Sequence, residues 1–234
     1  MGILKTGCLG YDTSVGWYSY DDAQIRGNVQ RSLDQGFGAF KLKVSGSIER
    51  DLKRAESLRH MVSSEATIMF DANQQWSVPA AIAACRELDS FHPLRIEEPT
   101  HPDDIEAHRK LTAEVAPLSL ALGEHVPNRV VFKNFLEAGC VGFLQPDCTR
   151  LGGVSEFLTV SLLARRYDIP VVPHVGDMGQ IHQHLVLVNH VAMGHAEVFL
   201  EHIPHVSRYF VHPVQLSGGR YSIPQEPGCS SDLL

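Results

Sequence analysis

A short apolar run that ends in an ionisable side chain recurs seven times along this chain, at steps of 23 to 28 residues. The runs read FKLK, TIMFD, LRIEE, LSLALGE, VGFLQPD, VVPH and EVFLE. A step of this length fits one strand, one loop, one helix and one return loop, so the repeat predicts a β/α series. In a β/α barrel the carboxyl ends of the strands face one mouth, where active sites of that fold lie. The residues expected at this mouth are Lys43, Asp71, Glu97, Glu124, Asp147, His174 and Glu201.

The number of strands and helices predicts how the barrel closes. A further strand pattern, LGYDTSVGWY at 9–18, precedes the first helix, which brings the expected total to eight strands and seven helices. The length of 234 residues is close to the roughly 250 typical of one such barrel, so we expect a (β/α)7β barrel of the α/β class. We expect residues 1–8 to form an N-terminal extension, 9–204 the barrel, and 205–234 a C-terminal segment that wraps the outside. The helical patterns lie at 21–35, 47–62, 78–89, 103–115, 128–139, 153–167 and 180–193.

Composition excludes several classes of partner. A net charge of −7 argues against a nucleic-acid or anionic-membrane surface, because either would need a basic face. No apolar stretch approaches the roughly 18 residues of a membrane span. The N-terminal residues also lack the apolar region of a secretory signal. The five cysteines are scattered and contain no C-x-x-C pair, which favours reduced thiols and a cytoplasmic location.

Two lysines lie on one face of the second expected strand. In FKLKV, Lys41 and Lys43 point to the same side because side chains alternate along a strand. The alternative is an edge strand with this face in solvent, but the regular series of strand-end charges favours the mouth. Two ammonium groups that lie close together, near a bound cation, lower each other's pKa, and this makes a lysine a neutral base near pH 7.

Three carboxylates follow three consecutive strands. Asp71, Glu97 and Glu124 would repel one another at one mouth, and a divalent cation would resolve that repulsion. An all-oxygen set of ligands favours Mg²⁺, with Mn²⁺ as the alternative metal. The competing interpretation is that each carboxylate pairs with a lysine or caps a helix. Glu98 competes with Glu97 for the inward position, because alternation lets only one of the two point inward.

The next two strand ends carry a carboxylate and a histidine. Asp147 beside His174 would fix the tautomer of the imidazole and raise its basicity, so an acid/base dyad is favoured over a buried core histidine. Glu201 is either a hydrogen-bonding wall of the pocket or a simple strand terminus. For the remaining histidines of the last helical region we expect only surface or packing roles; they are His182, His184, His190 and His195.

Six of these motifs together resemble a known family. KLK, FDANQ, IEEP, GEH, QPD and PH, in this order, resemble the barrel domain of the enolase superfamily, mandelate racemase subgroup. TSVGW, RIEEPT with HPDD, GEHVPNRVVFK and DCTRLGGVSE are similar to the sugar-acid dehydratases of the L-fuconate type. The resemblance covers most of residues 9–205. It implies Mg²⁺ ligands at Asp71, Glu97 and Glu124, a base at Lys43 with Lys41 as its electrostatic partner, and an acid/base dyad of Asp147 and His174 on the opposite face. It also implies substrate contacts at Glu201, Asn73 and Trp17.

The resemblance also implies a reaction. In a dehydratase, Lys43 would remove the proton α to a carboxylate and His174 would help the β-hydroxyl to leave, giving a 2-keto-3-deoxy sugar acid. A racemase or epimerase would instead reprotonate the α carbon from the opposite face. The family has an N-terminal α+β capping domain, so we expect here a barrel without its cap, which acts slowly on a sugar acid and assembles as a homo-oligomer. A truncated, inactive barrel with an interaction role is the remaining alternative.

Overall fold

The computed structural model describes residues 2–175, 180–205 and 207–234. Residues 176–179, within the expected barrel range, and residue 206, within the expected C-terminal segment, lie outside the described residues.

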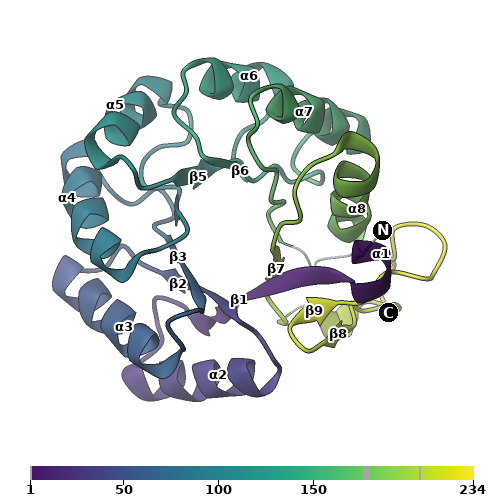
Figure 1. Ribbon diagram of the computed structural model, residues 1–234, viewed down its shortest axis with the longest axis horizontal. Helices are drawn as coiled ribbons and strands as arrows, with labels where there is room; N and C mark the ends of the chain where they lie inside the picture. Colours follow the sequence, from purple (N-terminus) through teal and green to yellow (C-terminus); the bar gives the residue numbers. More distant parts are fainter. Residues whose placement is uncertain (1, 176–179, 206) are drawn as a thin grey trace.

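Parallel strands form the inner ring of the molecule (Figure 1). The first six pair in chain order, and the first also pairs with the last of the ring. A single parallel bridge between Leu144 and Val171 lies on the far side of the sixth strand. The expected (β/α)7β ring is therefore confirmed. Its strands are β1 (Cys8–Gly16), β2 (Ala39–Lys43), β3 (Thr67–Asp71), β4 (Ile96–Glu97), β5 (Leu120–Leu122), β6 (Phe143–Leu144) and β7 (Leu200–His202).

Seven helices form the outer layer, each within two residues of the expected bounds (Figure 1). Side-chain caps explain why several begin where they do. Asp21 accepts a hydrogen bond from the Gln24 backbone in a capping box, and Asn128 accepts from two amides of its first turn. The helices are α2 (Asp22–Asp34), α3 (Ile48–Met61), α4 (Val78–Leu88), α5 (Ile105–Val115), α6 (Arg129–Glu137), α7 (Val154–Arg166) and α8 (Ile181–Met193).

Alternation along the strands divides apolar from polar side chains. Phe40 and Leu42 of β2 are fully buried in a cluster that includes Leu58 of α3. Burial of side chains of this size contributes about 1.5–3 kcal/mol each. Lys41 and Lys43 lie on the opposite face of the same strand. The packing between ring and helices thus leaves the other face of β2 for charged side chains.

The two ends of the chain meet beside β1. A short helix, α1 (Ile3–Thr6), leads into β1, and β8 (Leu216–Ser217) and β9 (Arg220–Tyr221) form a hairpin whose second strand pairs antiparallel with β1. The C-terminal segment therefore extends the sheet instead of only wrapping the outside. The described residues also include two 3-10 turns, η1 (Asp89–Phe91) and η2 (Ser207–Tyr209). None of the helices described here is long and apolar enough to span a membrane.

Candidate active site

The strand ends expected to carry the site lie in register. Lys43 of β2 is opposite Asp71 of β3, which is opposite Glu97 of β4. All three are buried, and they form one row at the carboxyl ends of adjacent parallel strands. This is the edge where the β/α series predicted the mouth.

Lys41 is the buried cation at the centre of the site. Its Nζ lies 2.8 Å from Glu97 Oε2, 2.7 Å from Glu201 Oε1 and 3.3 Å from Asp71 Oδ2. Burial alone would lower the pKa of Lys41, but the carboxylates of Glu201 and Glu97 raise it well above its usual range. The three carboxylates around Lys41 therefore favour its charged form.

Lys43 is held by one carboxylate. Its Nζ lies 2.5 Å from Asp71 Oδ2 and 5.4 Å from the ring of Trp17. Burial lowers the pKa of Lys43 and so does Lys41, but Asp71 outweighs both and the pKa is raised. The protein groups alone therefore favour the charged form of Lys43, whereas the sequence led us to expect a neutral lysine near pH 7. The reason is that the attraction of Asp71 outweighs the repulsion from Lys41.

Glu97 has one oxygen that the protein does not satisfy. Its Oε2 contacts Lys41 and accepts a hydrogen bond of 2.8 Å from Gln145 Nε2. Its Oε1 is buried and has no hydrogen-bond partner among the described residues. Burial and the neighbouring charge of Asp71 raise the pKa of Glu97. A buried carboxylate with a free oxygen suits a divalent cation, so the donor set fits the Mg²⁺ expected from the sequence.

Glu124 lies on the other side of the site. Its Oε2 is 3.1 Å from His174 Nε2, and its Oε1 is 3.4 Å from Arg150. Burial raises the pKa of Glu124; His174 opposes this, whereas Glu98 and Asp71 add to it. Across the part of the chain that the structure describes, the oxygens of Asp71, Glu97 and Glu124 do not gather within 4.8 Å of one another. Glu124 turns toward His174, and its convergence with the other two carboxylates stays a prediction.

Glu98 also reaches the mouth, contrary to the expectation that only one of the two glutamates would do so. Its Oε1 lies 2.8 Å from His125 Nδ1, and its Oε2 accepts from Gln74 Nε2 at 2.9 Å. Strict alternation fails because β4 ends at Glu97 and Glu98 has a φ of 43°. The turn therefore places both carboxylates at the same end of the barrel. With His125 and Glu124, Glu98 forms a second group of oxygen and nitrogen donors within 4.8 Å of one another.

Asp147 and His174 form the expected pair. Asp147 Oδ2 lies 2.9 Å from His174 Nδ1, which therefore donates to the carboxylate. Burial alone would lower the pKa of His174, but Asp147 raises it, with help from Glu201 and Glu124. Burial opposes ionisation of Asp147, but the hydrogen bonds from His174 and Thr149 hold its pKa well below the usual range. The geometry leaves His174 Nε2 on the side of Glu124; the acid/base role of the pair stays a prediction.

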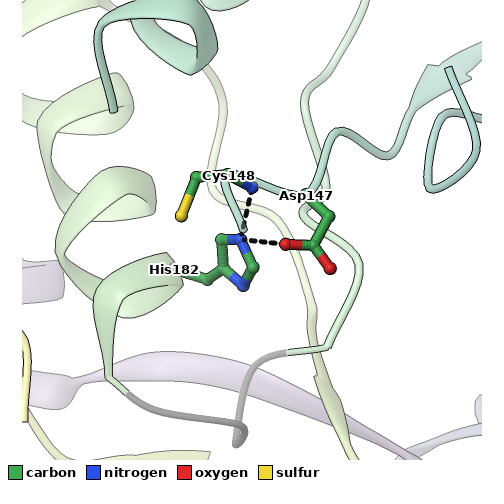
Figure 2. Close-up of side chains that lie close together, drawn as sticks. All are labelled: Asp147, Cys148 and His182. Carbon is green, nitrogen blue, oxygen red and sulfur yellow. Dashed lines mark hydrogen bonds and ion pairs between the residues drawn. The ribbon is translucent and has the colours of Figure 1, made fainter. Parts of the chain in front are cut away.

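His182 is the residue that the sequence reasoning missed. We expected it to have only a surface or packing role, but it is buried and its Nε2 lies 3.4 Å from Asp147 Oδ1 (Figure 2). Nε2 also lies 3.0 Å from the backbone amide of Cys148. The available signal was positional, since His182 lies in the first turn of the helix that follows the strand end of His174.

Both carboxylate oxygens of Glu201 have partners within the protein. Its Oε1 contacts Lys41 and accepts from Thr13 Oγ1 at 2.6 Å, and its Oε2 accepts from the Val175 amide at 3.1 Å. Although burial opposes ionisation, Lys41 and His174 hold the pKa of Glu201 well below its usual range. Glu201 thus ties the last strand of the ring to the first two; a substrate contact from it stays a prediction.

The two other expected substrate contacts lie near Asp71 and Lys43. The backbone amide of Asn73 donates to Asp71 Oδ1 at 3.0 Å, and the side-chain Oδ1 of Asn73 accepts from the Tyr18 hydroxyl at 3.0 Å. The indole Nε1 of Trp17 is buried and has no hydrogen-bond partner among the residues described. Both are beside the charged row, and their contact with a substrate stays a prediction.

The barrel and its charged mouth agree with the comparisons with known proteins. Residues 24–233 match the family described as enolase C-terminal domain-like, and the chain belongs to this family.

Individual relatives are similar over almost the whole chain. Human mitochondrial enolase superfamily member 1 is 37% identical over 237 residues, which cover 99% of this chain and 54% of the relative. Its crystal structure superposes with a TM-score of 0.94. L-galactonate dehydratase of Hypocrea jecorina is 38% identical over 229 residues, covering 95% of this chain and 51% of that protein.

A third relative was crystallised with ligands. The structure of L-talarate dehydratase from Polaromonas sp. JS666, complexed with Mg and L-glucarate, has a TM-score of 0.86 and 28% identity, and it covers all of this chain and 64% of that one. The present chain spans about half the length of the curated relatives named here.

Proposed function

We propose that this chain is the barrel of a Mg²⁺-dependent sugar-acid dehydratase that removes the proton α to a carboxylate and eliminates the β-hydroxyl. The observation that carries the proposal is the pairing of two basic side chains with separate carboxylates in one mouth. Lys43 forms an ion pair with Asp71, and His174 forms one with Asp147. The similarity to dehydratases of L-galactonate and L-talarate supports the choice of sugar acids as the substrate class.

Asp71, Glu97 and Glu124 would hold the Mg²⁺. Once bound, the metal supplies positive charge that stabilises the negative charge developing on the substrate carboxylate. The free Oε1 of Glu97 supports this assignment, because a buried carboxylate oxygen without a partner is costly. Mn²⁺ has the same preference for oxygen ligands and is the alternative metal.

Lys43 and His174 carry out the proton transfers. Neutral Lys43 takes the α proton, and Asp71 governs how readily this amine is neutral because it is the group that raises its pKa. Protonated His174 gives a proton to the β-hydroxyl, which leaves as water, and the resulting enol tautomerises to a 2-keto-3-deoxy acid. Asp147 holds the imidazole with Nδ1 protonated and Nε2 directed into the site. Lys41 stays charged, and its contacts with Glu97 and Glu201 favour the ionised forms of both carboxyls.

A panel of sugar acids tests the proposal. The chain is incubated with Mg²⁺ and L-galactonate, L-talarate, L-glucarate or L-fuconate, and release of 2-keto acid and exchange of the α proton with solvent deuterium are measured. We expect both with at least one substrate, and we expect Lys43→Met to abolish the exchange. Lys53→Met, which changes an exposed lysine of α3, is the matched control. An epimer without keto acid would indicate racemisation, and neither product at any Mg²⁺ concentration would favour an inactive barrel.

A further inference from the structure

His182 connects the two turns that carry the Asp147–His174 pair. Its Nδ1 lies 2.7 Å from the carbonyl oxygen of Val175, the residue that follows His174. Its Nε2 lies 3.0 Å from the amide nitrogen of Cys148, the residue that follows Asp147 (Figure 2). One imidazole in the first turn of α8 therefore contacts the backbone directly after each member of the pair.

The partners determine which ring nitrogen carries the proton. A carbonyl oxygen can only accept, so Nδ1 of His182 is protonated and donates to Val175. A backbone amide can only donate, so Nε2 presents its lone pair to Cys148. Burial lowers the pKa of His182, and a hydrogen bond from Nε2 to Asp147, with Cys148 adding to the effect, would raise it to about 9. The amide contact is 3.0 Å against 3.4 Å to the carboxylate, and one nitrogen cannot accept and donate at once, so we assign the neutral imidazole.

The neutral form of His182 also argues against a metal site formed by Asp147, Cys148 and His182. Asp147, Cys148 and His182 present oxygen, sulfur and nitrogen atoms within 4.8 Å of one another, as the ligands of a soft metal would. The lone pair that a metal needs on His182 Nε2 is already directed at the Cys148 amide. The group is a hydrogen-bonded link between two turns.

The turn after His174 needs such a link. Val175 has a φ of 53°, a left-handed conformation that a β-branched residue adopts only when its surroundings impose it. Both of its backbone polar groups are held, the amide by Glu201 Oε2 and the carbonyl by His182 Nδ1. On the other turn, Asp147 Oδ1 accepts from the amide and the hydroxyl of Thr149.

We propose that His182 is a positioning residue that clamps the backbone of Cys148 to that of Val175 and so fixes the distance and orientation of Asp147 relative to His174. The consequence for catalysis rests on the function proposed above. Both contacts of the clamp lie on the His174 side of the site, and neither involves Lys43 or Lys41 directly.

Nuclear magnetic resonance tests the clamp without any substrate. In the uniformly ¹⁵N-labelled chain, we expect His182 as the neutral tautomer with Nδ1 protonated, and a coupling through the hydrogen bond between the Cys148 amide nitrogen and His182 Nε2. His182→Phe should remove the coupling, whereas His184→Phe, two residues along the same helix, should leave it. A protonated Nε2 on His182, or no coupling in the wild-type chain, would overturn the proposal.

Kinetics then separate positioning from a general structural role. With a substrate that the panel identifies, we expect His182→Phe to slow keto-acid release roughly tenfold to a hundredfold, the range found for the hydrogen-bond partners that orient metal-ligating side chains. Exchange of the α proton, which belongs to Lys43, should change less than about twofold, a small effect beside the hundredfold that misplacement can cause. His182→Gln, whose amide oxygen can accept from Cys148, should recover part of the loss.

The outcomes are distinct. Equal losses of exchange and keto-acid release in a folded His182→Phe chain would show that His182 only supports the fold, and would overturn the proposal. If His182→Phe does not fold, His182→Gln and the wild-type coupling still decide it. If the wild-type chain acts on no sugar acid, the proposed function fails, while the coupling still reports whether the clamp exists.

Discussion

Lys41 contacts three buried carboxylates, so replacing it should lower the free energy of unfolding. Lys41→Met leaves Asp71, Glu97 and Glu201 facing one another in a buried space. Loss of one partner from a buried ionic group costs about 3–5 kcal/mol, so we expect the free energy of unfolding at pH 7 to fall by that order. Urea denaturation followed by circular dichroism measures it.

An exposed pair provides the control for this variant. Lys53 lies 3.7 Å from Asp22 with both side chains at least half exposed, so Lys53→Met should change stability little. Equal stability of the wild-type and Lys41→Met chains would contradict the central role of Lys41 in the charge network.

His174 should make stability depend on pH in a defined direction. Its pKa in the folded chain is raised above the usual value of about 6.5, so the folded state binds the proton more tightly than the unfolded state. The resulting stabilisation is complete below about pH 6.5 and is lost as the pH rises through the higher folded pKa. The wild-type chain should therefore exceed His174→Gln in unfolding free energy by more at pH 6 than at pH 9.

Asp147 tests the cause of this dependence. It is the largest raising influence on the pKa of His174, so the difference between pH 6 and pH 9 should shrink in an Asp147→Asn background. Urea titrations of the four chains at both pH values give the comparison. A difference that grows with pH would contradict the raised pKa.

At the scale of elements, Gly123 allows the backbone at the end of β5 to lie close to the backbone that follows β6, next to Glu124 at the mouth. Its φ is 152°, and a Cβ atom there would lie 2.6 Å from the backbone nitrogen and carbon of Gln145. Gly123→Ala must therefore shift the end of β5 or of β6, which should lower the unfolding temperature and displace Glu124. Calorimetry together with Mg²⁺ titration detects both effects.

Gly27 is the matched control for this substitution. It lies in the exposed part of α2, and a Cβ atom there would meet nothing within 4 Å. Gly27→Ala should stabilise the chain by about 1 kcal/mol, the helix-propensity difference between the two residues. Destabilisation by both substitutions would argue against the close approach at Gln145 as the cause.

The elements differ in how far the sequence predicts them. Helix bounds were predictable within two residues because caps such as Asp21 and Asn128 are local signals. Glu98 was misplaced because alternation holds only inside a strand, and β4 ends one residue before it. His182 was missed because its partners are backbone atoms from two other turns, which no spacing within a helix reveals. The raised pKa of Lys43 likewise required the distance to Asp71.

At the scale of the whole molecule, the C-terminal hairpin secures the seam between the first and last strands of the ring. β9 pairs with β1, and the Tyr221 hydroxyl donates to the backbone oxygen of Glu201 in β7 at 2.6 Å. Tyr221→Phe leaves that buried oxygen without this donor, and we expect a loss of about 0.5–1.5 kcal/mol in unfolding free energy. Urea denaturation checks this.

The measurement has a control in the same hairpin. Ser217→Ala alters an exposed residue of β8 and should change stability little. Loss of stability with Ser217→Ala but not with Tyr221→Phe would contradict the role of the tyrosine. The homo-oligomer expected from the sequence also stays a prediction, which sedimentation velocity checks.

The pairing of β1 with β7 joins segments from opposite ends of the chain, with Gly10 opposite Leu200 and Tyr11 opposite Glu201. During synthesis the first strand therefore waits for its second parallel neighbour until most of the chain has been translated. Over that period β1 is an open edge, which favours pairing with other chains, and Lys41 lacks one of its carboxylates. Contacts of such long sequence separation also form slowly. A ribosome-bound chain that has not yet exposed Glu201 should consequently have neither a closed ring nor an assembled site, and this interval is when it would depend most on chaperones.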